Sequence, residues 1–330
     1  MFFLTGYLNH AASIQAATAE FGIKARMDLA NFSLELGKSV QRRVWKPRFV
    51  GAAQGRTAYI DRMGPNTRGF AGWLPYDMRR WPVASDKAEF KKFAASKDVP
   101  TPAACTDASA IGGPFLIKKF RSSFGEGIRG PFLKFDPGQL DHALRDGEYY
   151  ENFILGHIVK AWYWGSTWGA IEVRQPPVVT GDGHTPLRAL VQAKLDSAPD
   201  RPHDWQALSD LARYCGVQSL DDVPAPSREV LIDFKYGSRY EPTSRANRNV
   251  IDKLRATPLA SQFERAGEVF SHSITDYGDA SLFTLDAMVD SEGTVWFLEM
   301  NSNPMVHPDL YPLVLRDQFD AARARLPLAA

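Results

Sequence analysis

The spacing of apolar residues in the first third of the chain predicts two helices followed by an irregular segment. Residues 11–22 and 28–40 carry apolar side chains at helical intervals, and those of the second range form a broad face. Residues 55–85 are rich in glycine, proline and aromatic side chains, which is typical of a surface segment dominated by turns. We expect this part of the chain to form a separate N-terminal domain.

Strands and helices are mixed in the next stretch of the chain. A helix is expected to begin at a cap formed by Ser85 or Asp86 and to end before Pro100. The segments GPFLIKKF and IRGPFLKF, joined by the turn RSSFGEG, predict a hairpin. A helix over 137–146 and a strand in YYENFILG complete this expected unit.

The remainder of the chain predicts a larger unit of the same mixed kind. HIVKAWYWG and GAIEVRQP have the pattern of paired strands, REVLIDFKYG reads as a strand, and SLFTLDAMVD and TVWFLEMN form a hairpin around DSEG. Four helices are expected here, one capped by Thr185 with Pro186 at its first position, and three over 204–215, 248–256 and 259–276. Strand pairs without regular βαβ alternation predict an α+β fold, divided into units at 1–84, 85–150 and 151–330.

The last hairpin carries carboxylates inside apolar strands, where such residues are rare. If residues 290–293 form its loop, Asp286 faces Phe297, and Glu299 is the diagonal neighbour of Asp286, with the two Cα atoms about 7–8 Å apart. A slip of one residue in the register would place the two carboxylates on opposite faces. The alternative is that Asp286 faces solvent on an edge strand and that Glu299 only ends one.

Asn301 shares the face of Glu299, because side chains two positions apart in a strand point the same way. Asp286, Glu299 and Asn301 would then bring three oxygen-bearing side chains together. Such a set suits Mg²⁺ or Mn²⁺ better than zinc.

The glycine-containing hairpin carries groups that suit an anion. Glycines let backbone N–H groups approach a phosphate closely, serine hydroxyls add donors, and a lysine at the end of an apolar strand supplies a point charge. The residues concerned are Lys118, Ser122, Ser123, Gly125 and Gly127. A plain turn without a ligand remains the alternative.

Composition narrows the class of protein. The 330 residues are 44% hydrophobic and 23% charged, as in an ordinary globular protein, and the net charge of +1 argues against nucleic-acid binding through a large basic surface. Only Cys105 and Cys215 are present, so the sequence shows no zinc motif or disulfide framework. The start of the chain lacks a signal-peptide pattern, and no apolar run approaches the roughly 20 residues of a membrane span. We expect a cytoplasmic protein without nucleic-acid or membrane partners.

Five segments in succession resemble a known superfamily. SDKAEFKKFAASKDVPTP, PFLIKKFRSSFGEGI, YYENFILG and RQPPVVTGDGHTPLRAL precede the hairpin that carries Asp286, Glu299 and Asn301. Together they resemble the ATP-grasp ligases, above all the cyanophycin synthetase and D-alanine–D-alanine ligase branches, over residues 85–305. The resemblance implies two α+β lobes with ATP in the cleft between them, behind a divergent N-terminal domain.

The resemblance also implies roles for individual residues, with ATP and Mg²⁺ (or Mn²⁺) as cofactors. Lys87 and Lys118 fall on the two lysines that contact ATP, and Ser122, Ser123, Gly125 and Gly127 fall on the loop over its phosphates. The adenine strand corresponds to Glu151, Asn152, Phe153 and Ile154. The magnesium ligands correspond to Asp286, Glu299 and Asn301. The chain departs from the family at Lys119, at Ser122 and at Ile158, where a ribose-binding acid is expected.

Cations near the substrate would stabilise the anionic intermediate of such a ligase. The candidates are Lys160, Arg174, Lys235, Arg239, Arg245 and Arg248, each of which could instead belong to a solvated basic surface. NPMVHPDLYP, after the metal residues, is a candidate lining for the acceptor site, with packing by Met305 and Tyr311 as the equal alternative. His307 has no partner visible in the sequence and is taken as structural.

The resulting hypothesis is an ATP- and Mg²⁺-dependent carboxylate–amine ligase that forms an amide or peptide bond through an acyl phosphate. An ATP-grasp kinase and a non-catalytic nucleotide-binding protein are the alternatives. The sequence predicts a small-molecule or peptide substrate, names neither the carboxylate nor the amine, and leaves a homodimer open.

Overall fold

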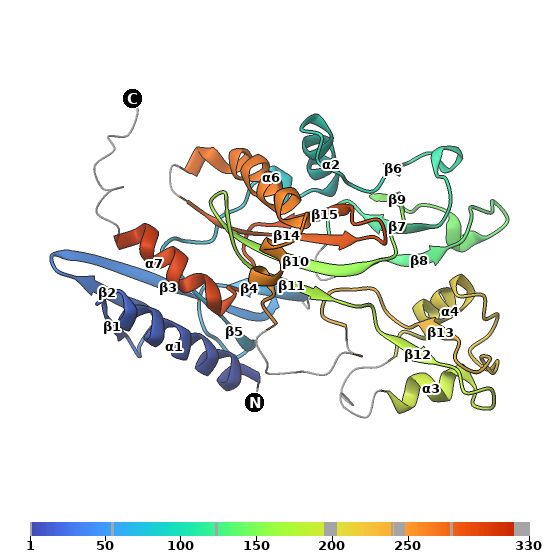
Figure 1. Ribbon diagram of the computed structural model, residues 1–330, viewed down its shortest axis with the longest axis horizontal. Coiled ribbons are helices and arrows are strands. Elements are labelled where there is room, and N and C mark those ends of the chain that lie inside the picture. Colours follow the sequence, from blue (N-terminus) through green and yellow to red (C-terminus); the bar gives the residue numbers. More distant parts are fainter. Residues whose placement is uncertain are drawn as a thin grey trace.

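Antiparallel sheets form the framework of the chain and helices cover their faces, in the α+β arrangement that the sequence predicted (Figure 1). The computed structural model describes residues 2–319, apart from 54–55, 123–124, 195–202, 239, 241–247 and 278–279. Within these residues the strands form one five-stranded, two four-stranded and one two-stranded sheet. No helix in the described part is long and apolar enough to cross a membrane.

The N-terminal part is a helix and a sheet, not two helices and a loop. Leu34 and Leu36 are buried while Glu35 between them is exposed, and this period of two belongs to a strand. The helix predicted over 28–40 is therefore wrong, and residues 55–85 contain two strands in place of an irregular segment. The elements are α1 (Phe2–Glu20), β1 (Lys24–Met27), β2 (Leu34–Lys38), β3 (Gln41–Ala53), β4 (Arg56–Ile60) and β5 (Thr67–Leu74).

A second sheet, in the order β6-β9-β7-β8, contains the predicted glycine hairpin. Asp86 caps the preceding helix α2 by accepting a hydrogen bond from the Ala88 N–H. The helix expected over 137–146 is wrong: only a 3-10 turn forms there, and the Arg129 side chain binds two carbonyls of that segment. The elements are η1 (Pro82–Ala84), α2 (Lys87–Ser96), β6 (Ala104–Cys105), η2 (Ala108–Ala110), β7 (Phe115–Lys119), β8 (Arg129–Phe132), η3 (Leu140–His142) and β9 (Glu148–Asn152).

The third sheet, in the order β11-β10-β14-β15, is covered on both faces. On one face, helix α6 packs Phe263 and Phe270 against Phe297. On the other, Trp164 and Leu282 share a hydrophobic core with the N-terminal sheet. The elements are β10 (His157–Trp164), β11 (Thr167–Arg174), α5 (Ile251–Arg255), α6 (Leu259–Ser271), η4 (His272–Tyr277), β14 (Leu282–Val289), β15 (Val295–Asn301), η5 (Pro308–Leu310) and α7 (Tyr311–Phe319).

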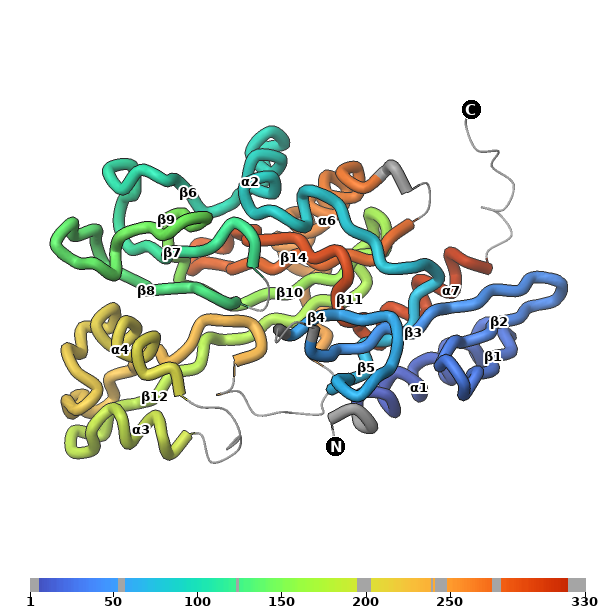
Figure 2. Tube along the Cα trace, turned by 180° about the vertical axis from the view of Figure 1, so that it is seen from behind, coloured from blue at the N-terminus to red at the C-terminus, as the bar shows by residue number. Residues whose placement is uncertain are grey.

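A small unit with its own core is inserted between β11 and α5. Its helix α4 lies beside β8 in both views (Figures 1 and 2), and Leu211 of α4 packs with Leu116 of β7. Pro186 stands at the N-cap of α3, which has no side-chain cap, so the cap predicted at Thr185 is wrong. The elements are β12 (Val178–Thr180), α3 (Leu187–Ala193), α4 (Trp205–Tyr214) and β13 (Glu229–Leu231).

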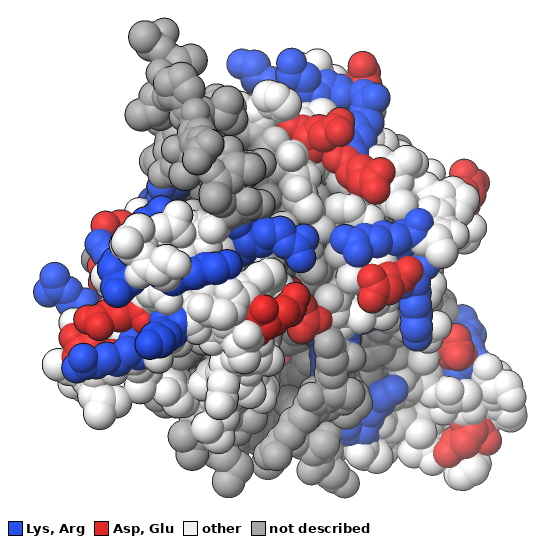
Figure 3. All heavy atoms as spheres, turned by 60° about the vertical axis from the view of Figure 1, so that its left-hand side comes forward, with Lys and Arg blue, Asp and Glu red and all other residues white. Residues whose placement is uncertain are grey.

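Charges of both signs are spread over the surface. On the face shown in Figure 3, Lys and Arg side chains alternate with Asp and Glu side chains and do not merge into a single basic field. This mixture agrees with the net charge of +1.

Candidate functional site

A row of four charged side chains crosses the third sheet on the face that it shares with the N-terminal sheet. Lys160 of β10 pairs with Glu172 of β11 on one side and with Asp286 of β14 on the other, and Asp286 pairs with Glu299 of β15. The Lys160 ammonium forms an ion pair with Asp286. Asn301 donates a hydrogen bond of 3.3 Å from its Nδ2 to Asp286 Oδ2. The three predicted metal residues therefore lie together on one face.

The register of the last hairpin differs from the prediction. Phe297 pairs with Ala287 and not with Asp286, and an irregularity between Asp286 and Ala287 then leaves Leu298 as an extra residue in β15. This extra residue forms a β-bulge, so the side chains that follow it in β15 point to the same face of the sheet as their partners in β14. Glu299 consequently lies directly opposite Asp286, where the sequence placed it on the diagonal.

The two carboxylates have different electrostatic surroundings. Burial raises the pKa of Asp286, and the negative charge of Glu299 adds to this effect although Lys160 opposes it. Burial would also raise the pKa of Glu299, but the positive charges of Lys87, Lys160 and Lys118 outweigh it and hold that pKa below its ordinary value. Glu299 is therefore the more firmly charged carboxylate of the pair.

Lys87, at the start of α2, joins three segments that lie far apart in the sequence. Its Nζ is 2.9 Å from Glu299 Oε2 and donates a 2.9 Å hydrogen bond to the Ser122 carbonyl. Asp86, which caps the same helix, forms an ion pair with Arg121. The Lys87 ammonium group thus contacts both the glycine-containing hairpin, at Ser122, and the last hairpin, at Glu299. We call these the glycine hairpin and the carboxylate hairpin.

Glu151 holds a second lysine cluster in the buried part of the second sheet. Its carboxylate, 1% exposed, forms ion pairs with Lys118 and, at 2.7 Å, with Lys91. Burial would raise the pKa of Glu151, but the two lysines hold it below its ordinary value, and burial lowers the pKa of Lys91. Sequence reasoning missed Lys91, although its position four residues after Lys87 on α2 is a usable signal.

The other residues of the expected adenine strand make contacts within the protein. The Asn152 side chain donates to the Gly112 carbonyl at 3.0 Å, Phe153 packs edge-to-face on Phe234, and Ile154 is half-buried. Ile158, where a ribose-binding acid was expected, is buried.

The glycines of the loop have the backbone that the sequence predicted for a tight turn. Gly125 and Gly127 have φ values of +70° and +73°, which favour glycine. A Cβ at Gly125 would lie 3.4 Å from the Lys235 side chain, so that lysine lies against the loop. Ser123 lies outside the described residues.

Arg174 has its own carboxylate partner. Its guanidinium forms an ion pair with Glu172 and lies over the Tyr236 ring, 4.4 Å from the centroid, while the Tyr236 hydroxyl donates to Glu172 at 3.0 Å. Arg239 and Arg245 lie outside the described residues.

The N-terminal sheet also reaches the site. The hydroxyl of Tyr59, in β4, accepts a 3.3 Å hydrogen bond from the Met305 N–H. Burial raises the pKa of Tyr59, Lys160 opposes the rise and Asp286 adds to it, so all three groups are neighbours. Sequence reasoning missed Tyr59 because no motif covers residues 1–84.

The donor set fits a hard divalent cation. Asp286, Glu299 and Asn301 offer carboxylate and amide oxygens from one face, which are the ligands that Mg²⁺ accepts. Within the described residues, no group of three or more His, Cys, Asp and Glu side chains could hold a metal. The two carboxylates and the amide would therefore need phosphate oxygens or water to complete the coordination.

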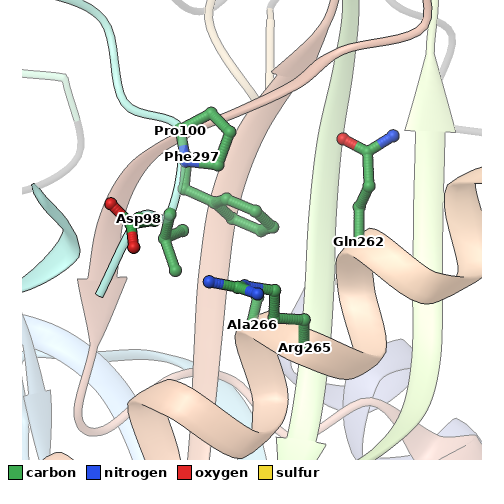
Figure 4. A pocket seen from close by; sticks show the side chains of 7 residues that line it. Asp98, Pro100, Gln262, Arg265, Ala266 and Phe297 are labelled. Carbon is green, nitrogen blue, oxygen red and sulfur yellow. The ribbon is translucent and has the colours of Figure 1, made fainter.

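A cavity of about 510 Å³ lies away from the charged row. It is lined by residues of α6, by Phe297 and by the segment that includes Asp98 and Pro100 (Figure 4). Phe297 belongs to the core under α6, on the face of the sheet opposite the charged row. None of the predicted site residues lines this cavity.

No family model matches the sequence, and no curated protein does either. Solved structures do resemble the chain. A bifunctional glutathione synthetase from Pasteurella multocida is 17% identical (TM-score 0.42), with 93% of this chain and 43% of that enzyme covered. A biotin carboxylase from Campylobacter jejuni, in a structure named as an ATP complex, is 13% identical (TM-score 0.39), with 75% and 48% covered. A D-alanine–D-alanine ligase from Bacillus anthracis is 13% identical (TM-score 0.36), with 74% and 70% covered.

The matched region is less than half of the first two enzymes. At these identities, and with TM-scores below 0.5, the likeness carries nothing about the substrate or reaction of this chain.

Proposed function

We propose that the chain is an ATP- and Mg²⁺-dependent carboxylate–amine ligase that forms an amide through an acyl phosphate. The observation that carries this proposal is the pair of contacts made by Lys87, which ties the glycine hairpin at Ser122 to the carboxylate hairpin at Glu299. The motifs assign these residues to ATP, to its phosphates and to the metal, respectively. Residues that the resemblance assigns to three parts of the nucleotide site thus meet at one ammonium group.

The chain's own side chains suit a polyanionic nucleotide. Lys87, Lys91, Lys118 and Lys160 face three carboxylates, those of Glu151, Asp286 and Glu299, so this cluster has one positive charge in excess. A metal ion bound by Asp286, Glu299 and Asn301 would neutralise phosphate charge. The phosphates would compete with the carboxylates for contact with the lysines. The lysines would then bind the nucleotide as point charges.

The residues around Asp286 are suited to the second half of the reaction. Lys160 places a cation beside the proposed metal residues, where it can stabilise the negative charge of a tetrahedral intermediate. Lys235, against the glycine loop, and Arg239 and Arg245 are proposed to orient the carboxylate substrate. Arg174 is proposed to act only indirectly, because Glu172 already neutralises it.

The test measures ADP release with each amino acid as the carboxylate substrate, in the presence of hydroxylamine. A ligase makes an acyl phosphate that hydroxylamine traps as a hydroxamate, and Glu299→Gln should lower this turnover by about 100-fold or more because it removes charge from the metal site. The exposed Glu292→Gln, in the turn of the same hairpin, is the matched control. ADP with a phosphorylated product and no hydroxamate would identify a kinase, and ATP binding without ADP would identify a non-catalytic protein. A cytoplasmic location, which supplies ATP, is proposed for this activity.

A further inference from the structure

Glu172 ends the charged row opposite the proposed metal residues, and only one of its two carboxylate oxygens is used. Oε2 accepts hydrogen bonds from the Tyr236 hydroxyl at 3.0 Å and from Arg174. Within the described residues, Oε1 accepts no hydrogen bond. His307 Nε2 lies 3.8 Å from Oε1. Glu172 is 9% exposed, and its second oxygen keeps acceptor capacity that the described residues do not use.

Glu172 Oε1 and His307 Nε2 are separated by a gap of 3.8 Å. This distance is too long for a hydrogen bond, but an atom bound beside the two groups, off the line that joins them, would lie within hydrogen-bonding distance of both. His307 Nδ1 accepts the Asp309 N–H at 3.2 Å, so the neutral ring carries its proton on Nε2. Burial lowers the pKa of His307, which favours this neutral form.

The gap lies on the same face of the third sheet as the proposed metal residues, where a second substrate of the proposed reaction would have to bind. Glu172 and Asp286 flank Lys160 across three neighbouring strands, which places their backbones about 10 Å apart. The ring of Trp162 contacts His307, and that of Tyr236 lies 5.0 Å from Lys160 Nζ. An acceptor bound here would lie beside aromatic rings, on the same face of the sheet as the proposed metal residues.

We propose that Glu172 binds the amine acceptor and takes its proton. This inference rests on the proposed ligase function and assigns the acceptor end of the same site. The acceptor is a primary amine that enters as an ammonium ion, donates one N–H to Glu172 Oε1 and occupies the gap beside His307. Tyr236 and Arg174 are positioning residues, because they fix the carboxylate through its other oxygen.

The reaction balances with Glu172 as the proton acceptor. The amine nitrogen forms a bond to the acyl carbon, the bond from that carbon to the phosphate oxygen breaks, and its electron pair leaves with the phosphate. The nitrogen loses two protons: Glu172 takes the first, which frees the lone pair for attack, and the second leaves with the phosphate as hydrogen phosphate. The proton on Glu172 then passes to solvent, so the net products are amide, hydrogen phosphate and one proton.

The test compares two nucleophiles in the full-length protein with ATP, Mg²⁺ and the carboxylate that gives the most hydroxamate. Hydroxylamine is neutral near pH 7, whereas methylamine is a cation that must lose a proton before it attacks. In Glu172→Gln, the ratio of kcat/KM for methylamine to kcat/KM for hydroxylamine should fall by about 100-fold, the size expected for losing a general base. Glu268→Gln, on the exposed face of α6, should keep the wild-type ratio.

Tyr236→Phe covers the case in which Glu172→Gln does not fold. It keeps the ring under Arg174 and removes the hydroxyl that orients Glu172, so the same ratio should fall by about tenfold. A wild-type ratio in a folded Glu172→Gln protein, or in Tyr236→Phe if only that variant folds, overturns the assignment. If the wild-type protein forms no hydroxamate from any carboxylate, the proposed ligase function fails instead, and the two failures are distinct.

Discussion

Glu151 illustrates how a charged side chain can be both buried and stable in this chain. The lysines on either side, Lys118 and Lys91, compensate for the loss of water around its carboxylate, and the Tyr149 hydroxyl donates a further 3.3 Å hydrogen bond. The sequence assigned Lys118 to ATP and Glu151 to adenine but gave no sign that they contact each other. Such contacts depend on the pairing of β7 with β9, which residue spacing within either strand does not specify.

Glu151→Gln should therefore lower the free energy of unfolding by about 3 kcal/mol at neutral pH, because it leaves two buried lysines without a counter-charge. The pKa of Glu151 is lowered in the folded protein, so its stabilisation is present above the pKa of the unfolded chain and is lost as the pH falls. Urea unfolding from pH 7 downward measures this difference, which should shrink below about pH 4. The exposed Glu229→Gln is the control, and a difference that grows toward low pH would contradict the ion-pair explanation.

Among the helices and strands, the sequence correctly predicted those that have a clear local pattern, such as a helix cap or a turn between two apolar runs. The strands of the glycine-containing hairpin and of the last hairpin, the helix capped by Asp86 and the helix over 204–215 are confirmed, and the expected helix over 11–22 overlaps α1. The N-terminal strands were missed because their apolar residues also fit a helical period, and tertiary packing decided between the two. The bulge that sets Glu299 opposite Asp286 was missed because nothing in the local sequence requires an extra residue there.

The cap of α2 fixes the start of the helix that carries Lys87 and Lys91, both of which contact carboxylates of the candidate site. Asp86→Ala should cost about 1 kcal/mol of stability through the lost cap and should raise the KM for ATP severalfold by loosening the start of the helix. Asp204→Ala is the matched control, because Asp204 caps α4 in the same way through the Ala207 N–H. Thermal unfolding measures the change in stability, and ADP-release kinetics measure the change in KM for ATP. An equal rise in KM in the two variants would show a general loss of stability without a specific effect at the site.

In the whole molecule, the N-terminal residues lie beside the candidate site. Their sheet covers the end of the third sheet next to the charged row, and both views place β4 beside β10 and β11 (Figures 1 and 2). Trp45, Phe70 and Trp73 share one core with Trp164 and Leu282. The sequence separated residues 1–84 by the turn-rich segment at 55–85 and by the resemblance that begins at residue 85, whereas the apolar core runs across that boundary without a break.

This shared core predicts that the N-terminal and third sheets unfold together. Phe70 is 2% exposed, and Phe70→Ala should remove about 3–5 kcal/mol of stability from both sheets, including the strand that carries Asp286. Leu208→Ala in α4 is the control, because Leu208 belongs to the separate core of the inserted unit. Hydrogen exchange followed by mass spectrometry distinguishes them: Phe70→Ala should speed exchange in residues 282–289, while Leu208→Ala should speed it mainly in α4 and its neighbours. Unchanged protection of 282–289 in Phe70→Ala would show that the N-terminal sheet is an independent unit, and its contribution to the site would then have to come from docking of a separately stable domain.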